Sequence, residues 1–332
     1  MVAFVLRRLF AIIPTLLAIV TLAFVLIRAA PGGPFDADRK LDEKVIAALE
    51  AEYHLDWPVF PVHRKLDQKT GERTGPWRVS GLGEWHKTQY THYLGRLMHG
   101  DLGPSTRYPN VGVTELLLQG LPPTLIVGLL SLILSLGVGL AVGLAAGWKP
   151  NSPVDYASMA VVMVGISIPS FVLAPLLIAF FSLGLGWLPV AGFSSWSNLV
   201  LPVLCLSALN SAYIARLARG AMREIMPRDF IRTARSLGYD EFGVVTMHAL
   251  RGALVPVVSF LGPAVAATLT GSLVVETIFR IPGIGRHFVM AALNRDYTLV
   301  MGTILFYSLV LLIANLLVDV AYALLDPRVR YA

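Results

Sequence analysis

The segment FIRTARSLGYDEFGVVTMHALRGALVP, residues 230–256, lies in a polar connection between two strongly apolar stretches of the chain. Over residues 230–238 apolar and polar side chains alternate at helical spacing, and Gly238 is a natural stop for a helix. Asp229 precedes the pattern and is the expected N-cap. We therefore predict a short two-faced helix at a membrane surface, with Phe230, Ile231, Ala234 and Leu237 on its apolar face and Arg232, Thr233, Arg235 and Ser236 on its polar face.

Two interpretations of this helix stay open on physical grounds alone. Interfacial helices commonly extend arginine side chains to lipid headgroups. The guanidinium groups of Arg232 and Arg235 are equally suited to carboxylates on a partner protein. The periodicity does not separate lipid contact from protein docking.

The composition of the whole chain is that of an integral membrane protein. Its 332 residues are 55% hydrophobic and only 14% charged, and its mean hydropathy is +0.67. Several apolar runs approach or exceed the roughly 20 residues that a helix needs to cross a bilayer. We predict an all-α fold with six transmembrane helices, at Leu9–Ile27, Leu116–Ala146, Val154–Leu185, Leu199–Leu217, Ala253–Val275 and Leu299–Leu325.

The positive charges predict the orientation of these spans. Arg7 and Arg8 precede a first apolar stretch that is too long for a signal peptide, so we expect an uncleaved span that starts inside. Alternation then places residues 216–252 in the cytoplasm, where seven arginines against four acidic residues give a net charge of +3. Both termini are expected to be cytoplasmic. Three arginines in the last external turn oppose this orientation: Arg280, Arg286 and Arg295.

The domain organisation follows from the same pattern. Residues 1–30 form the first transmembrane segment, and residues 31–114 form an extracytoplasmic subdomain inserted between the first two spans. Residues 115–332 form the membrane core, whose main cytoplasmic connection lies at about 220–252. Within the subdomain we expect a helix at 42–55 and an exposed loop at 67–83.

The chain lacks the motifs of an enzyme or an ATP-binding protein. It has no nucleophile elbow, no paired intramembrane carboxylates and no phosphate-binding loop. Its histidines do not show metal-ligand spacing, and its single Cys205 allows no intrachain disulfide. The basic residues flank apolar runs, which indicates topology signals rather than nucleic-acid binding. We expect no catalytic residue, metal or cofactor on this chain.

Polar residues inside the spans are candidates for a pathway or for structural pairs. Asn315 and Asp319 share a helix face that we expect to point into the protein, because polar groups in lipid are costly. A structural pair of Asp319 with Arg216 or Arg219 is favoured over a transport role. The candidate pathway residues are Asn210, Tyr213 and Asn315.

The stretch RTARSLGYDEFGVVTMHAL, residues 232–250, resembles the EAA loop of ABC importer permeases of the dipeptide/oligopeptide/nickel group. Residues 232–234 and Gly238 fall on its EAA and glycine positions. The chain departs from the generic loop at Arg232, Thr233 and Arg251, as the peptide-importer branch does. Further matching motifs, in family order, are LRRLFAIIPTLLAIVTLAFVLIRAAPGGPF (6–35), YHLDWP (53–58), HGDLGPS (99–105), ISIPSFVLAPLL (166–177), ETIFRIPGIG (276–285), ALNRDY (292–297) and VDVAYALLDPRVRY (318–331).

These motifs are most similar to the first, oligopeptide-type, membrane subunit of the family, and only residues 60–89 look longer than its usual external loop. The resemblance implies a type I importer permease in the bacterial inner (plasma) membrane. It implies as partners a second homologous permease, two cytoplasmic ATPases that bind ATP and Mg, and an external peptide-binding protein. The implied ATPase-coupling residues are Phe230, Ile231, Arg232, Thr233, Ala234, Arg235, Leu237 and Gly238.

The substrate stays open within this resemblance. We expect oligopeptides as the leading substrate class and dipeptides as the next, with nickel chelates or antimicrobial peptides as the alternatives. A passive channel and a membrane hydrolase are remote alternatives from other functional classes. A channel would conduct without ATP, and a hydrolase would need a nucleophile and base that the sequence does not supply.

Overall fold

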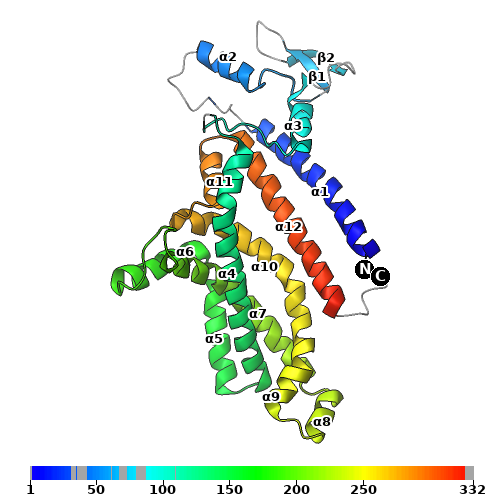
Figure 1. The fold of residues 1–332 in the computed structure, drawn as a ribbon, viewed down its shortest axis with the longest axis vertical. Coiled ribbons are helices and arrows are strands. Elements are labelled where there is room, and N and C mark those ends of the chain that lie inside the picture. Colours follow the sequence, from blue (N-terminus) through cyan, green and yellow to red (C-terminus); the bar gives the residue numbers. More distant parts are fainter. Residues whose placement is uncertain are drawn as a thin grey trace. The chain divides into compact units, whose positions relative to one another are not determined.

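A computed structural model of the chain describes residues 2–30, 35, 43–60, 62–66, 73–79, 87–108 and 110–325 (Figure 1). The predicted all-α membrane fold is confirmed, with the addition of one small β-hairpin. The helices are α1 (Val2–Ala29), α2 (Glu43–Glu52), α3 (Gln89–Met98), α4 (Val113–Trp148), α5 (Pro153–Ser167), α6 (Ser170–Leu177), α7 (Ser197–Ile225), α8 (Asp229–Ser236), α9 (Glu241–Gly243), α10 (Leu250–Ile278), α11 (Ile284–Leu293) and α12 (Tyr297–Leu325). Two π-helical segments, Ile178–Gly184 and Val244–Ala249, continue α6 and precede α10.

The hairpin lies in the insertion between the first two spans. Strand β1 (Val62–Leu66) pairs antiparallel with β2 (Arg73–Val79), with Val62 opposite Val79 and Leu66 opposite Arg73. Part of the stretch 67–83 that we expected to be a loop is therefore a strand. Residues 67–72 and 80–83 lie outside the described residues.

Five helices of the described chain are long and apolar enough to cross a membrane, and two further apolar helices form a bent pair. The predicted single helix Val154–Leu185 is wrong, because α5 and the helix that starts at Ser170 meet at an angle of 107°. Pro169 causes the break: it has no N–H to donate, and it forces Ile168 out of helical geometry, to φ −97° and ψ 113°. The described chain therefore has five of the six predicted spans as single long helices, and the count reaches six if the bent pair is one span.

Two compact units make up the chain. The first comprises Met1–Leu16, Gly120–Val289 and Phe306–Ala332, and the second comprises Leu17–Gln119 and Met290–Leu305. Each unit therefore contains segments that are distant in the sequence.

The first unit is built around α7, which packs against α10, α5 and α6. Three glycines of α4, spaced four residues apart, let this helix approach α7 closely. A Cβ added at Gly139, Gly143 or Gly147 would come within 2.7 Å of an atom of α7. Small residues at one face of a helix allow such close packing in membranes. Gly139, Gly143 and Gly147 therefore serve the packing of α4 on α7.

Two ion pairs join helices of the first unit. Asp155, whose side chain is only 1% exposed, receives two hydrogen bonds from Arg219, at 2.5 and 2.8 Å. Asp319 pairs with Arg8 at 3.2 Å. The predicted pairing of Asp319 with Arg216 or Arg219 is therefore wrong. Arg219 forms its ion pair with Asp155 instead. The guanidinium group of Arg216 lies over the ring of Tyr213, 5.0 Å from the ring centroid.

The second unit has a hydrophobic core of its own. Val20, Phe24, Tyr93 and Met301 are buried together. Outside this cluster, the buried Asp296 accepts a hydrogen bond from the hydroxyl of Ser105, which ties residues 290–305 to the insertion.

Candidate coupling surface and membrane pathway

The connecting segment, residues 226–249 between α7 and α10, contains the predicted helix as α8 (Asp229–Ser236). Its anchor is a pair of side chains, Ile231 and Ala234, which are fully or almost fully buried. They pack with Met222 and Ile225 from α7 and with Val244 after the turn. The end of α7 and the segment after the turn therefore hold α8 on one face.

The N-cap of α8 differs from the prediction. Arg228 occupies this position with extended backbone and no capping side-chain hydrogen bond, and Asp229 is the first helical residue. An acidic residue in the first turn still interacts favourably with the helix dipole. The predicted capping role of Asp229 is therefore wrong, and its carboxylate contributes at the first turn of α8 instead.

The predicted apolar face of α8 is only half buried. Phe230 is 46% exposed and Leu237 is 72% exposed, in contrast to Ile231 and Ala234. The apolar stripe is wider than the surface that α7 and the following turn can cover, so the residues at its edge stay uncovered. These two side chains are therefore free to contact something outside the described chain.

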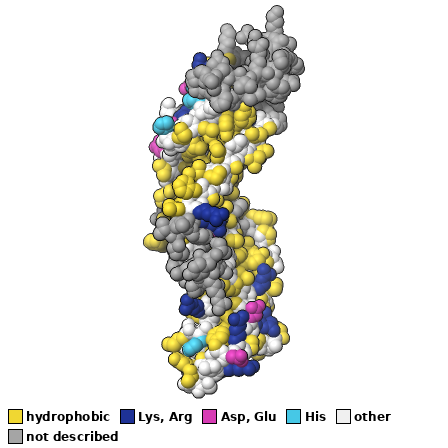
Figure 2. All heavy atoms as spheres, turned by 90° about the vertical axis from the view of Figure 1, so that its right-hand side faces the viewer, with side chains coloured by type: hydrophobic (Ala, Val, Ile, Leu, Met, Phe, Trp, Pro, Cys, Tyr) yellow, Lys and Arg dark blue, Asp and Glu magenta, His cyan; other side chains and the backbone are white. Residues whose placement is uncertain are grey.

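Other large apolar side chains of the connecting segment are exposed as well. Phe242 and Met247 are 72% and 71% exposed, and Tyr239 is 45% exposed. At the end of the molecule that carries α8 in Figure 1, Figure 2 shows hydrophobic side chains beside basic and acidic ones. An exposed apolar patch with a charged rim is typical of a protein-interaction site. We call Phe230, Leu237, Tyr239, Phe242 and Met247 the exposed apolar patch.

The arginines of α8 are engaged within the chain. Arg235 donates two hydrogen bonds to Glu241, at 2.8 and 3.2 Å, and the indole N–H of Trp148 donates to the same carboxylate at 3.1 Å. Arg232 lies 3.5 Å from Asp229. The ion pair of Arg235 and Glu241 spans the turn after α8, and Trp148 links that turn to the end of α4. Arg235 therefore holds the turn in place, and both arginines form part of the surface.

Gly238 ends α8 in the left-handed region, with φ +87°. Its N–H donates to the carbonyl of Arg235, and the N–H of Tyr239 donates to the carbonyl of Ala234. A Cβ at Gly238 would meet no neighbour within 4 Å. The backbone angle, and not crowding, therefore favours glycine here.

The three candidate pathway residues all lie near α10, but they do not line one cavity. Asn210 is buried, donates to Thr268 at 2.8 Å and keeps its carbonyl oxygen without a partner. It lines a cavity of about 150 Å³ beside the break at Ile168 and Pro169. The ring of Tyr213 packs against that of Phe260 of α10, with the two ring planes tilted by 34°. Asn315 is an exposed residue of α12 whose amide oxygen lies next to Gly262.

Sequence reasoning missed the role of Glu276, which is fully buried at the end of α10. Its carboxylate accepts hydrogen bonds from the hydroxyl of Thr124 at 2.9 Å and from the N–H of Gly285 at 2.7 Å. The hydroxyl of Thr124 in turn accepts from the N–H of Ile284 at 2.9 Å. Glu276 thereby holds the turn before α11 against α4. The available signal was an acidic residue within an apolar stretch, followed by the glycine-rich turn IPGIG.

Among the residues that the structure describes, no three His, Cys, Asp or Glu side chains are grouped closely enough to hold a metal ion.

A family model described as "Binding-protein-dependent transport system inner membrane component" matches residues 137–331. This match covers more than half of the chain and includes the whole connecting segment. The chain belongs to this family. It is therefore an ABC importer permease, a multi-pass membrane subunit that transports and is not an enzyme by itself. Membership implies ATPase, solute-binding and second permease partners.

Curated relatives match the chain over its full length. The oligopeptide transport system permease protein OppB of Escherichia coli K12 is 39% identical over 333 residues, which are 100% of both chains. The dipeptide transport system permease protein DppB of Bacillus subtilis is 40% identical over 330 residues, 99% of this chain and 98% of that protein. The resemblance inferred from the sequence motifs is confirmed.

A solved structure supports the fold independently of these relatives. A chain of the MetNI methionine ABC transporter in an inward-facing conformation matches with a TM-score of 0.52 and 21% identity. The match covers 64% of this chain and 96% of that one. At this identity the likeness concerns the fold alone.

Proposed function

We propose that the chain is the membrane subunit of an ATP-driven importer that takes up oligopeptides or dipeptides delivered by an external solute-binding protein. The full-length similarity to OppB and DppB supports this substrate class. Nickel chelates and antimicrobial peptides remain the alternative cargo of the same architecture. The chain itself performs no bond chemistry.

The proposed assembly contains a second homologous permease and two cytoplasmic ATPases, which bind ATP and Mg. We place the chain in the bacterial inner membrane with both termini in the cytoplasm. Residues 31–114 then form an extracytoplasmic subdomain, where the binding protein docks. The arginine excess of residues 216–252 supports this orientation.

The coupling site of this proposal is residues 230–238, seated in a groove of one ATPase. The observation that carries it is the division of the apolar stripe of α8. Ile231 and Ala234 fix the helix to the spans, while Phe230 and Leu237 stay exposed for a partner. The proposed site also includes Arg232, Thr233, Arg235 and Gly238, which supply its charged groups and shape the turn after α8.

In this proposal, the preference of ATP for one state of the ATPase pair drives the movement of the membrane spans. ATP binds better to the closed than to the open ATPase pair, so it shifts that pair toward closure. Because α8 is packed on α7 and precedes α10, its displacement moves the long helices of the first unit. We propose Asn210, Tyr213 and Asn315 as pathway residues, supported by the position of Asn210 at the cavity beside the broken span.

Reconstitution into proteoliposomes tests this function. The full set of this chain, the second permease, the ATPases and the binding protein should accumulate a radiolabelled tripeptide only when ATP is present. Omission of any one protein should reduce accumulation to background. A radioactive nickel chelate is tested in parallel, to show whether the importer takes up this alternative cargo instead of peptide.

Three outcomes contradict the proposal. Uptake by this chain without ATP would identify a channel, and peptide cleavage by the purified chain would identify a hydrolase. Accumulation of nickel chelate without accumulation of peptide would replace the substrate class.

A further inference from the structure

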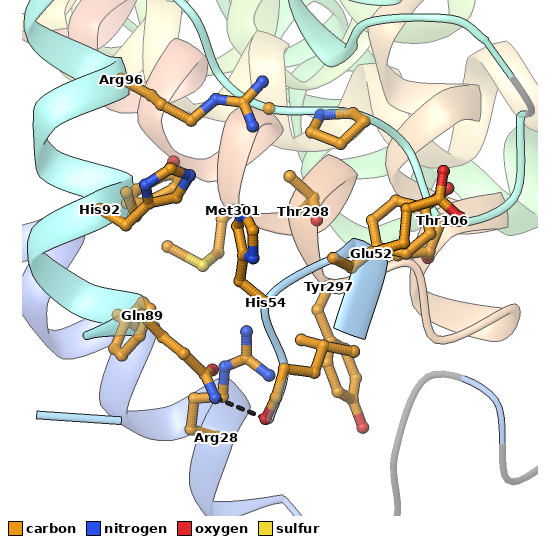
Figure 3. Close-up of a pocket in the computed structure, with 16 residues that line it drawn as sticks. Arg28, Glu52, His54, Gln89, His92, Arg96, Thr106, Tyr297, Thr298 and Met301 are labelled. Atoms are coloured by element: carbon orange, nitrogen blue, oxygen red, sulfur yellow. Dashed lines mark hydrogen bonds between the residues drawn. The ribbon is translucent and has the colours of Figure 1, made fainter. Parts of the chain in front are cut away.

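The second unit contains a cavity that the proposed coupling function does not use. It lies among the end of α1, α2 and the residues after it, α3, and the start of α12, and its volume is about 110 Å³ (Figure 3). Its lining carries charges of both signs, from Arg28, Arg96 and Glu52. All its lining residues belong to the second unit.

Unsatisfied polar atoms are concentrated around this cavity. Eight buried side-chain nitrogen or oxygen atoms of the described residues have no hydrogen-bond partner, and four of them belong to its lining. Buried polar groups are normally hydrogen-bonded, so such a concentration points to absent partners. The four atoms are Arg28 Nε, Gln89 Oε1, Tyr93 Oη and Thr106 Oγ1.

Arg28 supplies a cation that no carboxylate neutralises. Its guanidinium group lies over the ring of Phe24, at 5.6 Å, and it forms no ion pair with an acidic residue of the described chain. Arg96 differs, because it binds Asp101 through two hydrogen bonds at 3.0 and 2.8 Å. An unpaired, half-buried guanidinium group is suited to binding a carboxylate.

Gln89 supplies a fixed acceptor. Its amide nitrogen donates to the carbonyls of Leu55 and Trp57, at 2.8 and 2.7 Å, so the orientation of the amide group is determined. The amide oxygen is then left as an acceptor without a donor, although the side chain is only 7% exposed. A ligand with an N–H group would satisfy it.

Two further groups of the lining stay uncharged. Burial raises the pKa of Tyr93 to about 12, so its hydroxyl remains a donor. Burial, and then the neighbouring His54 and Arg96, lower the pKa of His92. Of the charged residues in the lining, Arg28 and Glu52 have opposite signs, and neither forms an ion pair within the part of the chain that the structure describes.

We propose that this cavity binds a small zwitterion with the chemistry of a free amino acid or a short peptide. Arg28 takes the carboxylate, Gln89 Oε1 accepts an N–H of the ligand, and Glu52 faces its ammonium group. The hydroxyls of Tyr93 and Thr106 are available to the polar atoms of the ligand. The proposal does not depend on coupling to an ATPase.

Binding of dialanine to the full-length chain tests this site. The chain is placed in phosphatidylcholine nanodiscs without ATPase or binding protein, and binding is followed by isothermal titration calorimetry. Saturable binding of dialanine is expected. Dialanine amide, which lacks the carboxylate, should bind at least about tenfold more weakly, as expected when a charged hydrogen bond is lost.

Variants assign the contact to Arg28. Arg28→Gln should weaken the binding of dialanine at least about tenfold. The control is Lys87→Gln, which removes the same charge from an exposed residue of the same unit and should leave dialanine binding unchanged. Arg28→Lys should retain part of the affinity. Thermal unfolding of each variant checks its folding, and the comparison of dialanine with its amide on the unmodified chain needs no variant.

Several results would overturn the proposal. Absence of saturable dialanine binding, equal binding of the amide, or unchanged binding by a folded Arg28→Gln chain would each do so. If phosphatidylglycerol stabilises the chain through Arg28 and dialanine has no effect, the occupant is a lipid phosphate instead. None of these results bears on ATP-driven uptake, which is measured separately.

Discussion

At the scale of single residues, the sequence indicated which side chains were costly in a membrane but not which partners they have. Asp319 was expected to need an arginine, and it has one, but the partner is Arg8 of the first helix. Asp155 takes Arg219 instead. Such pairs join segments far apart in the sequence, and no local pattern specifies which arginine is nearest.

Glu276 allows a direct test at this scale. Glu276→Ala leaves Thr124 and the N–H of Gly285 without their buried acceptor, so we expect the free energy of unfolding to fall by about 2–4 kcal/mol. Glu276→Gln keeps one acceptor and should lose less. The exposed Glu224→Ala on α7 is the control and should change stability by less than about 0.5 kcal/mol. Denaturant unfolding of the purified chains measures the difference, and equal stability of all three variants would contradict the assigned role.

At the scale of elements, prediction succeeded where the local pattern was complete. The periodicity of residues 230–237 and the following glycine located α8 closely. The broken third span was missed because the apolar composition continues across Pro169, although a proline after Ile168 is a signal for a helix end. The half-covered stripe of α8 was also missed, since exposure depends on how α7 and the following turn pack against it.

Gly238 tests the helix end that positions α8. Gly238→Val should strain the backbone at φ +87° by about 1–2 kcal/mol and should lower ATPase assembly without unfolding the spans. Gly238→Asn should be close to the unmodified chain, because asparagine tolerates this conformation. Gly220→Val, at an uncrowded helical glycine of α7, is the control. Co-purification of the ATPase reports assembly, and a Gly238→Val chain that assembles fully would show that this turn is not required.

At the scale of the whole molecule, the bilayer made the topology predictable. Spanning segments must satisfy their backbone groups internally, so six long apolar stretches were sufficient to predict the helical fold. The division into two units and the cavity of the second unit could not be predicted, because both bring together residues from the two ends of the sequence. The function that we propose depends on the connecting segment. There, a chain without chemistry of its own presents an anchored helix, α8, whose apolar edges are exposed.

The most direct measurement of this claim is ATP-driven peptide uptake by the reconstituted importer carrying Phe230→Ala and Leu237→Ala together. Both side chains are exposed, so their truncation leaves the spans intact and removes only contacts to a partner. The control is the pair Leu6→Ala and Phe10→Ala, which truncates an exposed leucine and phenylalanine of α1. We predict that the α8 pair lowers the initial uptake rate at least about tenfold, as expected for the loss of central apolar contacts in an interface, and that the α1 pair does not. Uptake at the unmodified rate by the α8 pair would contradict the account.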